Sequence, residues 1–398
     1  MFMKQIALIA ILLFTSFLLL HARPPGLGDQ QIARIFSLER KYLQNAWDSV
    51  KATGRMPRSP QKGFQPIEDW TSGFYAGSLW LVYQFTGDKT MLQKARQATA
   101  MLEADKDLTH NHDIGFIMYC SYGNGYRLTR DPAYKNILIH SARTALTRYN
   151  PRVQSIMSWN PQPERDWKFP VIIDNMMNLE LLLKATALGG DSSFYRVAVA
   201  HANTTLKHQY RSDYSCSHVV DYDPQTGAMR RRDWNNGNSD PATAAWSRGQ
   251  AWGLYGFGFM YRDTRDQTYL QQADHIAAYI LNHPNMPGDM VPYWDYSAPE
   301  ISAMRDASAA AITASALLQL APLSVHGKKY FAAAEKILSS LASPGYLNET
   351  GKGLFLLKHA TGNYLRKSEL DAGLIYADYY FLEALLRYKE LKKKYRSV

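Results

Sequence analysis

Cysteine is scarce in this chain of 398 residues, which has only Cys120 and Cys216. So few thiols exclude a scaffold held together by disulfides. We expect two buried free thiols, with a single disulfide as the alternative. His110 and His112 stand two residues apart, but no third and fourth ligand follows at a fitting spacing. We therefore expect no metal and no other cofactor.

Long hydrophobic runs are absent beyond the start of the chain, where an apolar run covers residues 6–20. Lys4 precedes this run and His21-Ala22-Arg23-Pro24-Pro25 follows it. The run is short for a bilayer span and has the arrangement of a cleavable secretory signal. We expect residues 1–22 to be a signal peptide and residues 23–398 to form one domain. The mature bacterial protein would be periplasmic or secreted and free of the membrane; a retained membrane anchor is the alternative.

Negative charge is in deficit, since 45 Lys and Arg stand against 35 Asp and Glu, a formal net charge of +10. On an exported protein this favours an anionic partner. No basic helix or nucleic-acid motif stands out, which argues against nucleic acid. Aromatic residues make up 13% of the chain, with 26 Tyr and 9 Trp. Aromatic rings stack on sugars while basic groups bind carboxylate or sulfate, so acidic carbohydrate fits better, although most rings should lie in the core.

A unit of two helices repeats along the chain. Each unit has a polar start, an apolar helix rich in small residues, a turn and an amphipathic helix. The units begin at Asp69, His112, Ile173, Ser247, Arg305 and Ser368. The turns of the first four end in Asp88, Asp131, Asp191 and Asp266. Each of these aspartates is placed to cap the second helix of its unit.

The first helix of each unit is apolar nearly all round and should be buried, whereas the second should lie outside it. A leading helix over residues 29–53 would pair with the sixth inner helix. This predicts an all-α fold, an (α/α)6 toroid of twelve helices in two concentric rings. Segment 216–233 alternates around a Pro-Gln-Thr-Gly turn and predicts a short β-hairpin insertion. Longer insertions, expected to crown one rim, are at 150–170, 209–247, 283–304 and 344–367.

Acidic residues stand at the starts of the inner helices, which would meet at one rim. They are Asp69, Asp113, Asp174, Asp306 and Asp371. Each can be a helix cap, and this is our expectation for Asp306 and Asp371. Asp174 differs, because it follows Val-Ile-Ile and a carboxylate is costly to bury there. Together with Asp113 it predicts two carboxylates in one funnel, where proximity and desolvation raise one pKa, as general acid–base catalysis needs.

Three further residues suit an acidic sugar. Arg248 and Trp252 are one helical turn apart, so a planar cation and a ring would share one face. His218 lies in the expected hairpin. Core packing of Trp252 and a structural role for His218 are the alternatives. A basic stretch before the sixth inner helix predicts contacts to sulfate, or else a solvated loop; it contains Lys358, His359, Asn363, Arg366 and Lys367.

These motifs resemble those of the unsaturated glucuronyl hydrolases, glycoside hydrolase family 88. The matching stretches span essentially the whole mature chain: EDWTSGFYAGSLW, HDIGFIMY, FPVIIDNMMNLELLL, SHVVDYDPQTG, WSRGQAWGLYGF and SELDAGLIYADYYFLEALLR. The resemblance implies an (α/α)6 barrel and a metal-free reaction on a terminal 4,5-unsaturated uronic acid. C4 is protonated and water adds at C5. The hemiketal then rearranges and releases the rest of the saccharide.

The resemblance also implies roles for particular residues. Asp174 of IDNMM corresponds to the general acid and base, and Asp113 of HDIGF to the second essential carboxylate. Residues implied around the uronate are His218, Arg248, Trp252 and, as a looser match, Trp159. Asn236 stands where the family commonly has Gln, which puts contacts beyond the uronate in doubt.

The expected substrate is an unsaturated acidic di- or oligosaccharide derived from a glycosaminoglycan, with or without sulfate. Gln250 favours the glucuronyl enzymes over the related unsaturated rhamnogalacturonyl hydrolases, which act on pectin fragments and remain an alternative. An inverting glycosidase on saturated sugars also needs two carboxylates. A non-catalytic protein that binds acidic oligosaccharides would suit the net charge but does not need the carboxylate pair.

Overall fold

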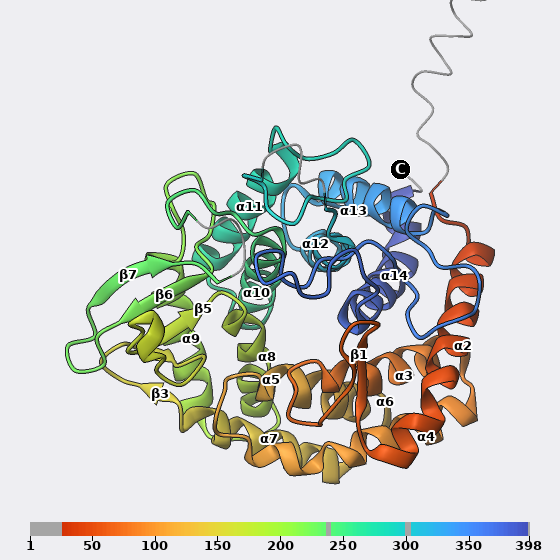
Figure 1. Ribbon diagram of the computed structural model, residues 1–398, viewed down its shortest axis with the longest axis horizontal. Coiled ribbons are helices and arrows are strands. Elements are labelled where there is room, and N and C mark those ends of the chain that lie inside the picture. Colours follow the sequence, from red (N-terminus) through yellow and green to blue (C-terminus); the bar gives the residue numbers. More distant parts are fainter. Residues whose placement is uncertain (1–25, 236–239, 299–303, 397–398) are drawn as a thin grey trace, which may run out of the picture.

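Six apolar helical segments form a closed inner ring, and six helices surround it (Figure 1). The computed structural model describes residues 26–235, 240–298 and 304–396. The inner segments are α3 (Ser72–Thr86), α5 (Ile114–Met118) with η2 (Tyr119–Gly123) and α6 (Asn124–Thr129), α8 (Asn175–Ala187), α10 (Ser247–Thr264), α12 (Ala307–Leu320) and α14 (Ile375–Arg396). The outer helices are α2 (Asp29–Thr53), α4 (Lys89–Met101), α7 (Pro132–Leu146), α9 (Ser192–His208), α11 (Gln267–Asn282) and α13 (Gly327–Leu341).

Contacts between neighbouring inner helices close the ring. They run from α3 to α5, α8, α10, α12 and α14, and then from α14 back to α3. The leading helix α2 packs on α3 and α14, as expected for the partner of the sixth inner helix. The predicted (α/α)6 toroid is confirmed.

The predicted caps of four outer helices are also confirmed. The side chains of Asp88, Asp131, Asp191 and Asp266 each accept a hydrogen bond from a backbone N–H in the first turn of α4, α7, α9 and α11. Each such cap contributes about 1 kcal/mol to helix stability. The aspartate that ends each turn therefore fixes where the chain reverses from the inner to the outer ring.

The sequence predicts one continuous α-helix for the second inner segment, but the structure shows an interrupted one. A π-helical turn, η2, separates α5 from α6. The Cys120 carbonyl within the wider turn accepts a hydrogen bond from Asn124 Nδ2 at 2.9 Å. Such π turns are rare, and a side chain that enters the backbone hydrogen-bond ladder is one known cause of an irregular helix.

Short strands form in the segments that connect the helices of the toroid. They are β1 (Met56–Ser59) paired with β2 (Gly63–Gln65), β3 (Tyr149–Asn150) paired with β4 (Ser155–Ile156), and the sheet β5 (Pro170–Ile172), β6 (Val219–Tyr222) and β7 (Met229–Asp233). Two short 3-10 turns are η1 (Glu103–Asp107) and η3 (Pro163–Arg165). The predicted hairpin is β6–β7, but the third strand, β5, was not foreseen.

Strand β5 has a direct consequence for the site. It pairs antiparallel with β6, and Ile173 N donates to His218 O at 3.1 Å just beyond the paired strands. Because β5 runs straight into Asp174 at the start of α8, the sheet brings Asp174 next to His218. The two motifs IDN and SHVV meet through backbone pairing.

Both cysteines are buried and free, as expected. Among the helices of the described residues, none is both long and apolar enough to cross a membrane. The expected signal peptide, residues 1–22, lies outside the described part of the chain.

Candidate active site

Three of the five acids at the inner rim are committed to the protein itself. Asp69 accepts hydrogen bonds from the backbone N–H and hydroxyl of Thr71. Asp306 caps α12 by accepting from two first-turn N–H groups, as predicted. Asp371 does not cap a helix, which corrects our expectation. It precedes the start of α14 by four residues and pairs with His359 at 2.5 Å in an exposed position.

Asp113 and Asp174 have side chains that cap nothing. Each immediately precedes an inner helix, α5 or α8, yet neither makes a side-chain capping hydrogen bond. Both line one cavity of about 430 Å³, and their side chains are 13% and 14% exposed. Asp174 Oδ2 is buried with no hydrogen-bond partner in the described residues. The two carboxyl groups are therefore available to a ligand.

Burial and like charge set the protonation of this pair. Burial raises the pKa of Asp113 well above its ordinary value, and the nearby Asp174 raises it further. The predicted raised pKa thus falls on Asp113. Two neighbouring carboxyl groups do not both ionise easily in a poorly hydrated site, so the pair can retain a proton near neutral pH.

Two imidazoles flank the two carboxyl groups. His218 Nε2 lies 3.3 Å from Asp174 Oδ2, and His112 Nε2 lies 3.4 Å from Asp113 Oδ1. Burial lowers the pKa of His112 to about 4, so this ring is neutral near pH 7. The cavity therefore holds two carboxyl groups, each beside a histidine: His112 directly precedes Asp113, whereas His218 reaches Asp174 from a distant segment.

Trp159 forms part of the cavity wall. Its ring stacks on Trp167 with centroids 5.6 Å apart and meets His218 edge-on at 6.0 Å. Trp167 is held in turn because its Nε1 donates to Asp233 Oδ2 at 2.7 Å. The ring of Trp159, which the resemblance implies near the uronate, thus packs against a second tryptophan that is itself held by a hydrogen bond.

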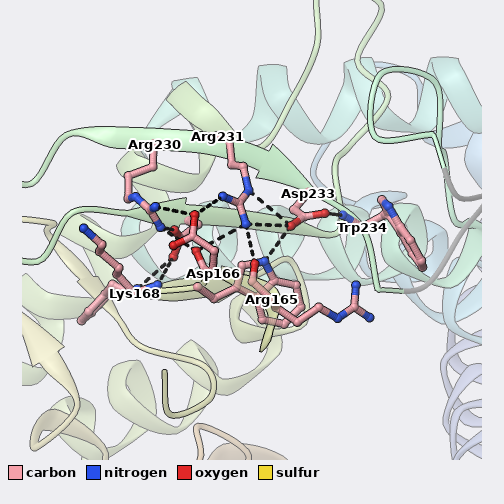
Figure 2. A network of polar contacts seen from close by, with 10 residues as sticks. Arg165, Asp166, Lys168, Arg230, Arg231, Asp233 and Trp234 are labelled. Carbon is pink, nitrogen blue, oxygen red and sulfur yellow. Dashed lines mark hydrogen bonds and ion pairs between the residues drawn. The ribbon is translucent and has the colours of Figure 1, made fainter. Parts of the chain in front are cut away.

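Figure 2 shows the polar network that anchors this wall on the β5–β6–β7 sheet. Arg231 contacts both Asp166 and Asp233, and Arg230 contacts Asp166 from the same strand. Arg165 lies over the Trp167 ring at 5.1 Å. The network ties the loop before β5 to β7, so the loop that carries Trp159 has a fixed position.

Arg248 lies in the cavity wall but has less to offer a ligand than expected. It is only 3% exposed. One terminal nitrogen donates to Asp306 Oδ2 at 2.7 Å and to Thr361 O at 2.6 Å, and the other donates to Gly362 O at 2.6 Å. Protein acceptors take both N–H groups of one terminal nitrogen and one of the other, whereas Arg248 Nε has no hydrogen-bond partner in the described residues. A contact of the remaining N–H groups with a sugar carboxylate stays a prediction. Arg248 joins α10 to α12 and to the loop at 361–362.

Trp252 also departs from the prediction. It is fully buried and packs against Phe116 and Tyr380, with ring centroids 5.2 and 5.3 Å away. It is not among the residues that line the cavity. The alternative of core packing therefore describes it.

The basic stretch before the sixth inner helix lies partly in the cavity wall and partly in solvent. Arg366 lines the cavity and donates to Asn235 Oδ1 at 2.7 Å. Lys367 is exposed and does not line the cavity. Asn236, expected to contact the sugar beyond the uronate, lies outside the described residues.

Several cavity residues escaped the sequence analysis. Arg58 and Glu369 both line the cavity and form a two-pronged pair at 3.0 and 2.7 Å. Arg58 also pairs with Asp69 at 2.8 Å. Arg58 was missed because the β1–β2 hairpin that carries it has no strong strand pattern. Glu369 is part of the SELDAG motif, but the sequence analysis assigned it no role. Other unforeseen residues of the wall are Lys62, Trp70, Asn235, Trp246 and Tyr376.

No group of three or more His, Cys, Asp or Glu side chains that could hold a metal occurs in the described residues. The absence of a cofactor remains a prediction from the sequence.

Comparison with known proteins bears on this arrangement. The chain matches the model of Glycosyl Hydrolase Family 88 over residues 44–390. It is 44% identical to an unsaturated glucuronyl hydrolase of Formosa agariphila, over 91% of this chain and 92% of that protein. It superposes on a crystal structure of an unsaturated glucuronyl hydrolase specific for heparin with a TM-score of 0.87 and 43% identity, covering 92% of this chain and 99% of that one.

A more distant solved structure contains a bound saccharide. It is a variant unsaturated glucuronyl hydrolase from Streptococcus agalactiae complexed with dGlcA-GalNAc6S, at 27% identity and a TM-score of 0.77, covering 92% of this chain and 93% of that one. The resemblance seen in the motifs is confirmed: the chain is a glycoside hydrolase and belongs to glycosyl hydrolase family 88.

Proposed function

We propose that this enzyme removes 4,5-unsaturated glucuronic acid from the non-reducing end of short acidic oligosaccharides by adding water across the double bond. One observation carries the proposal. Asp113 and Asp174 stand at inner-helix starts without capping them, and both face one cavity. The names of the Formosa agariphila relative and of the solved structures support the same substrate class.

Asp174 is the proposed proton donor. The C4=C5 bond is part of an enol ether, so protonation of C4 leaves positive charge on C5 that the ring oxygen shares. Water then adds at C5 and returns a proton to the Asp174 carboxylate, which restores the acid. The hemiketal formed in this way opens and releases the rest of the saccharide. The Asp174 side chain lines the cavity and is 14% exposed, which suits a group that must meet substrate.

Asp113 and the histidines prepare this step. The raised pKa of Asp113, caused first by burial and then by Asp174, keeps one proton within the pair near neutral pH. His218 lies within 3.3 Å of Asp174 Oδ2 and can orient that carboxyl group. Trp159 supplies a face for the sugar ring.

Arg366 is the proposed contact for a sulfate on the sugar beyond the uronate. It lines the cavity, and its side chain donates to Asn235, an uncharged amide. No carboxylate of the described residues lies within ion-pair distance of it, so its positive charge is not compensated locally. Lys62 lines the same cavity and adds a second cation. We therefore expect sulfated unsaturated disaccharides to be preferred over unsulfated ones.

The test uses disaccharides made by polysaccharide lyases, followed by the ultraviolet absorbance of the conjugated double bond. Loss of absorbance with glucuronyl substrates supports the proposal. Faster loss with unsaturated galacturonyl-rhamnose from pectin would favour the rhamnogalacturonyl alternative. Cleavage of saturated substrates alone would contradict the hydration chemistry.

We also propose that the protein is exported and loses residues 1–22. The apolar run at 6–20 and the Lys that precedes it support this. Mass spectrometry of protein expressed in a bacterial host tests it, and an uncleaved N-terminus in the mature fraction would contradict it.

A further inference from the structure

Asn178 connects the two motifs that carry the paired carboxyl groups. It lies on α8 one helical turn after Asp174 and is 5% exposed. Its Oδ1 accepts a hydrogen bond from the backbone N–H of Phe116 at 2.8 Å, in the first turn of α5. Its Nδ2 lies 3.2 Å from His112 Nδ1. Asn178 therefore connects helix α5, which follows Asp113, to the imidazole of His112, which precedes Asp113.

The orientation of the Asn178 amide group follows from these contacts. The backbone N–H of Phe116 needs an acceptor, so the amide oxygen must face it and the amino group must face His112. An amino group only donates, so Nδ1 of His112 must be the acceptor. A neutral imidazole carries one N–H, which then belongs to Nε2. That nitrogen is 3.4 Å from Asp113 Oδ1.

Gly115 makes this bridge possible. A Cβ at residue 115 would lie 2.5 Å from both the Cα and the Oδ1 of Asn178. No real side chain tolerates such distances, so only glycine lets α5 approach α8 closely enough for the two hydrogen bonds. The Gly of HDIGF and the second Asn of IDNMMN thus serve one contact.

We propose that Asn178 is a positioning residue that fixes the tautomer of His112, so that its Nε2–H faces the carboxyl pair and the substrate. With the other tautomer, the Nε2 lone pair would face Asp113 and accept the proton that the pair holds. The inference rests on the proposed function, since the proton matters only if these carboxyl groups act on substrate. Asn178 itself does not line the cavity and acts through His112.

Other titratable groups around His112 must be considered in any pH measurement. Those that interact with it electrostatically are Asp113, Asp174, Arg148, His201 and His218. Burial lowers the pKa of His112 to about 4, so the imidazole is neutral at any pH above about 5 and carries its single proton on either Nδ1 or Nε2.

The first test needs no substrate. Nitrogen-15 NMR of the resting wild-type enzyme with labelled histidine reports which ring nitrogen of His112 carries the proton, and His112→Gln assigns the signal. We expect an unprotonated Nδ1 and a protonated Nε2 near pH 7. A protonated Nδ1 would overturn the inference, whatever the substrate of the enzyme proves to be.

The second test changes the acceptor. Asn178→Asp keeps the shape and the hydrogen bond from Phe116, but offers His112 an acceptor in place of a donor. We expect the proton to move to Nδ1, kcat to fall roughly 10- to 100-fold, the range found when an orienting contact to a metal-bound imidazole is lost, and KM to change less. The pH–rate profile should also shift, because the new carboxylate raises the pKa of His112.

Asn124→Asp is the matched control. Asn124 is also a buried asparagine of the inner ring, 8% exposed, and lies in α6 beyond the π turn. The variant likewise places a carboxylate in the inner ring away from the cavity, where Arg127 donates to Asn124 Oδ1 at 2.8 Å, and it removes the hydrogen bond to the Cys120 carbonyl. We expect kcat and the His112 tautomer to stay as in wild type. Equal loss of activity in both variants would make the effect one of burial and overturn the inference. So would a proton moved to Nδ1 with kcat and pH profile unchanged.

Discussion

The substitution Asp113→Asn should make the protein less active and more stable. Burial and the charge of Asp174 raise the pKa of Asp113 in the folded state. Between the unfolded pKa and the folded pKa, the folded wild type binds more protons than the unfolded chain, so its stability falls as pH rises. Asparagine has the same shape and no proton to lose. The stability advantage of the variant should therefore be absent at low pH, grow above the ordinary Asp pKa of about 4 and level off above the folded pKa.

The size of this advantage follows from what the side chain lacks. Asp113 is 13% exposed and makes no capping hydrogen bond, so solvent and backbone compensate its charge poorly. A charge buried without partners costs more than the neutral amide that replaces it, and we expect a gain of roughly 1–3 kcal/mol at neutral pH. Urea unfolding at about pH 4 and at about pH 8 measures it, because the expected difference appears only at the higher pH.

Asp69→Asn is the control for this prediction. Asp69 is similarly exposed, at 14%, but its carboxylate accepts two hydrogen bonds from Thr71 and pairs with Arg58. That variant should lose stability at neutral pH. The reasoning would be refuted if Asp113→Asn lost stability as Asp69→Asn does, or if its effect were the same at both pH values.

Three further predictions follow from the site. Arg248→Ala should destabilise the protein by about 3–5 kcal/mol, because it leaves Asp306 buried and unpaired. A change below about 1 kcal/mol in urea unfolding would contradict the view that Arg248 holds α10 to α12. Arg366→Ala should remove most of the preference for sulfated disaccharides through KM, with an effect that shrinks as salt is added, whereas Lys367→Ala should change it little; an equal kcat/KM ratio in wild type and Arg366→Ala would contradict this. Chelators should leave activity unchanged, and loss of activity reversed by one divalent metal would overturn the metal-free account.

The fold was largely predictable because the repeat, the hydrophobic pattern and the capping residues all indicate the same architecture. Apolar inner helices, amphipathic outer helices and the aspartates that cap the latter recur in the same order, so the toroid follows from repetition. The π turn and strand β5 were not predictable in this way. The first depends on Asn124 reaching back to the Cys120 carbonyl, and the second on pairing with a strand that lies far along the chain.

The site was predictable only where local position carried the information. Asp174 stands out because an apolar stretch precedes it, and Asp113 because its unit repeats the same plan. Arg248 and Trp252 share one helix face, but that rule does not reveal which side of an inner helix meets the cavity. The partners that occupy Arg248, at residues 306, 361 and 362, come from later units and insertions. Such long-range contacts leave no local signal.

The most direct test of the central claim is the turnover of Asp174→Asn on a lyase-generated unsaturated glucuronyl disaccharide, followed by loss of ultraviolet absorbance beside the wild type. Circular dichroism and urea unfolding establish that the variant is folded. The account predicts steady loss of absorbance with wild type and a kcat lower by roughly two to four orders of magnitude in the variant, the contribution expected of a general acid. A folded variant that turns over within a few-fold of wild type would contradict it.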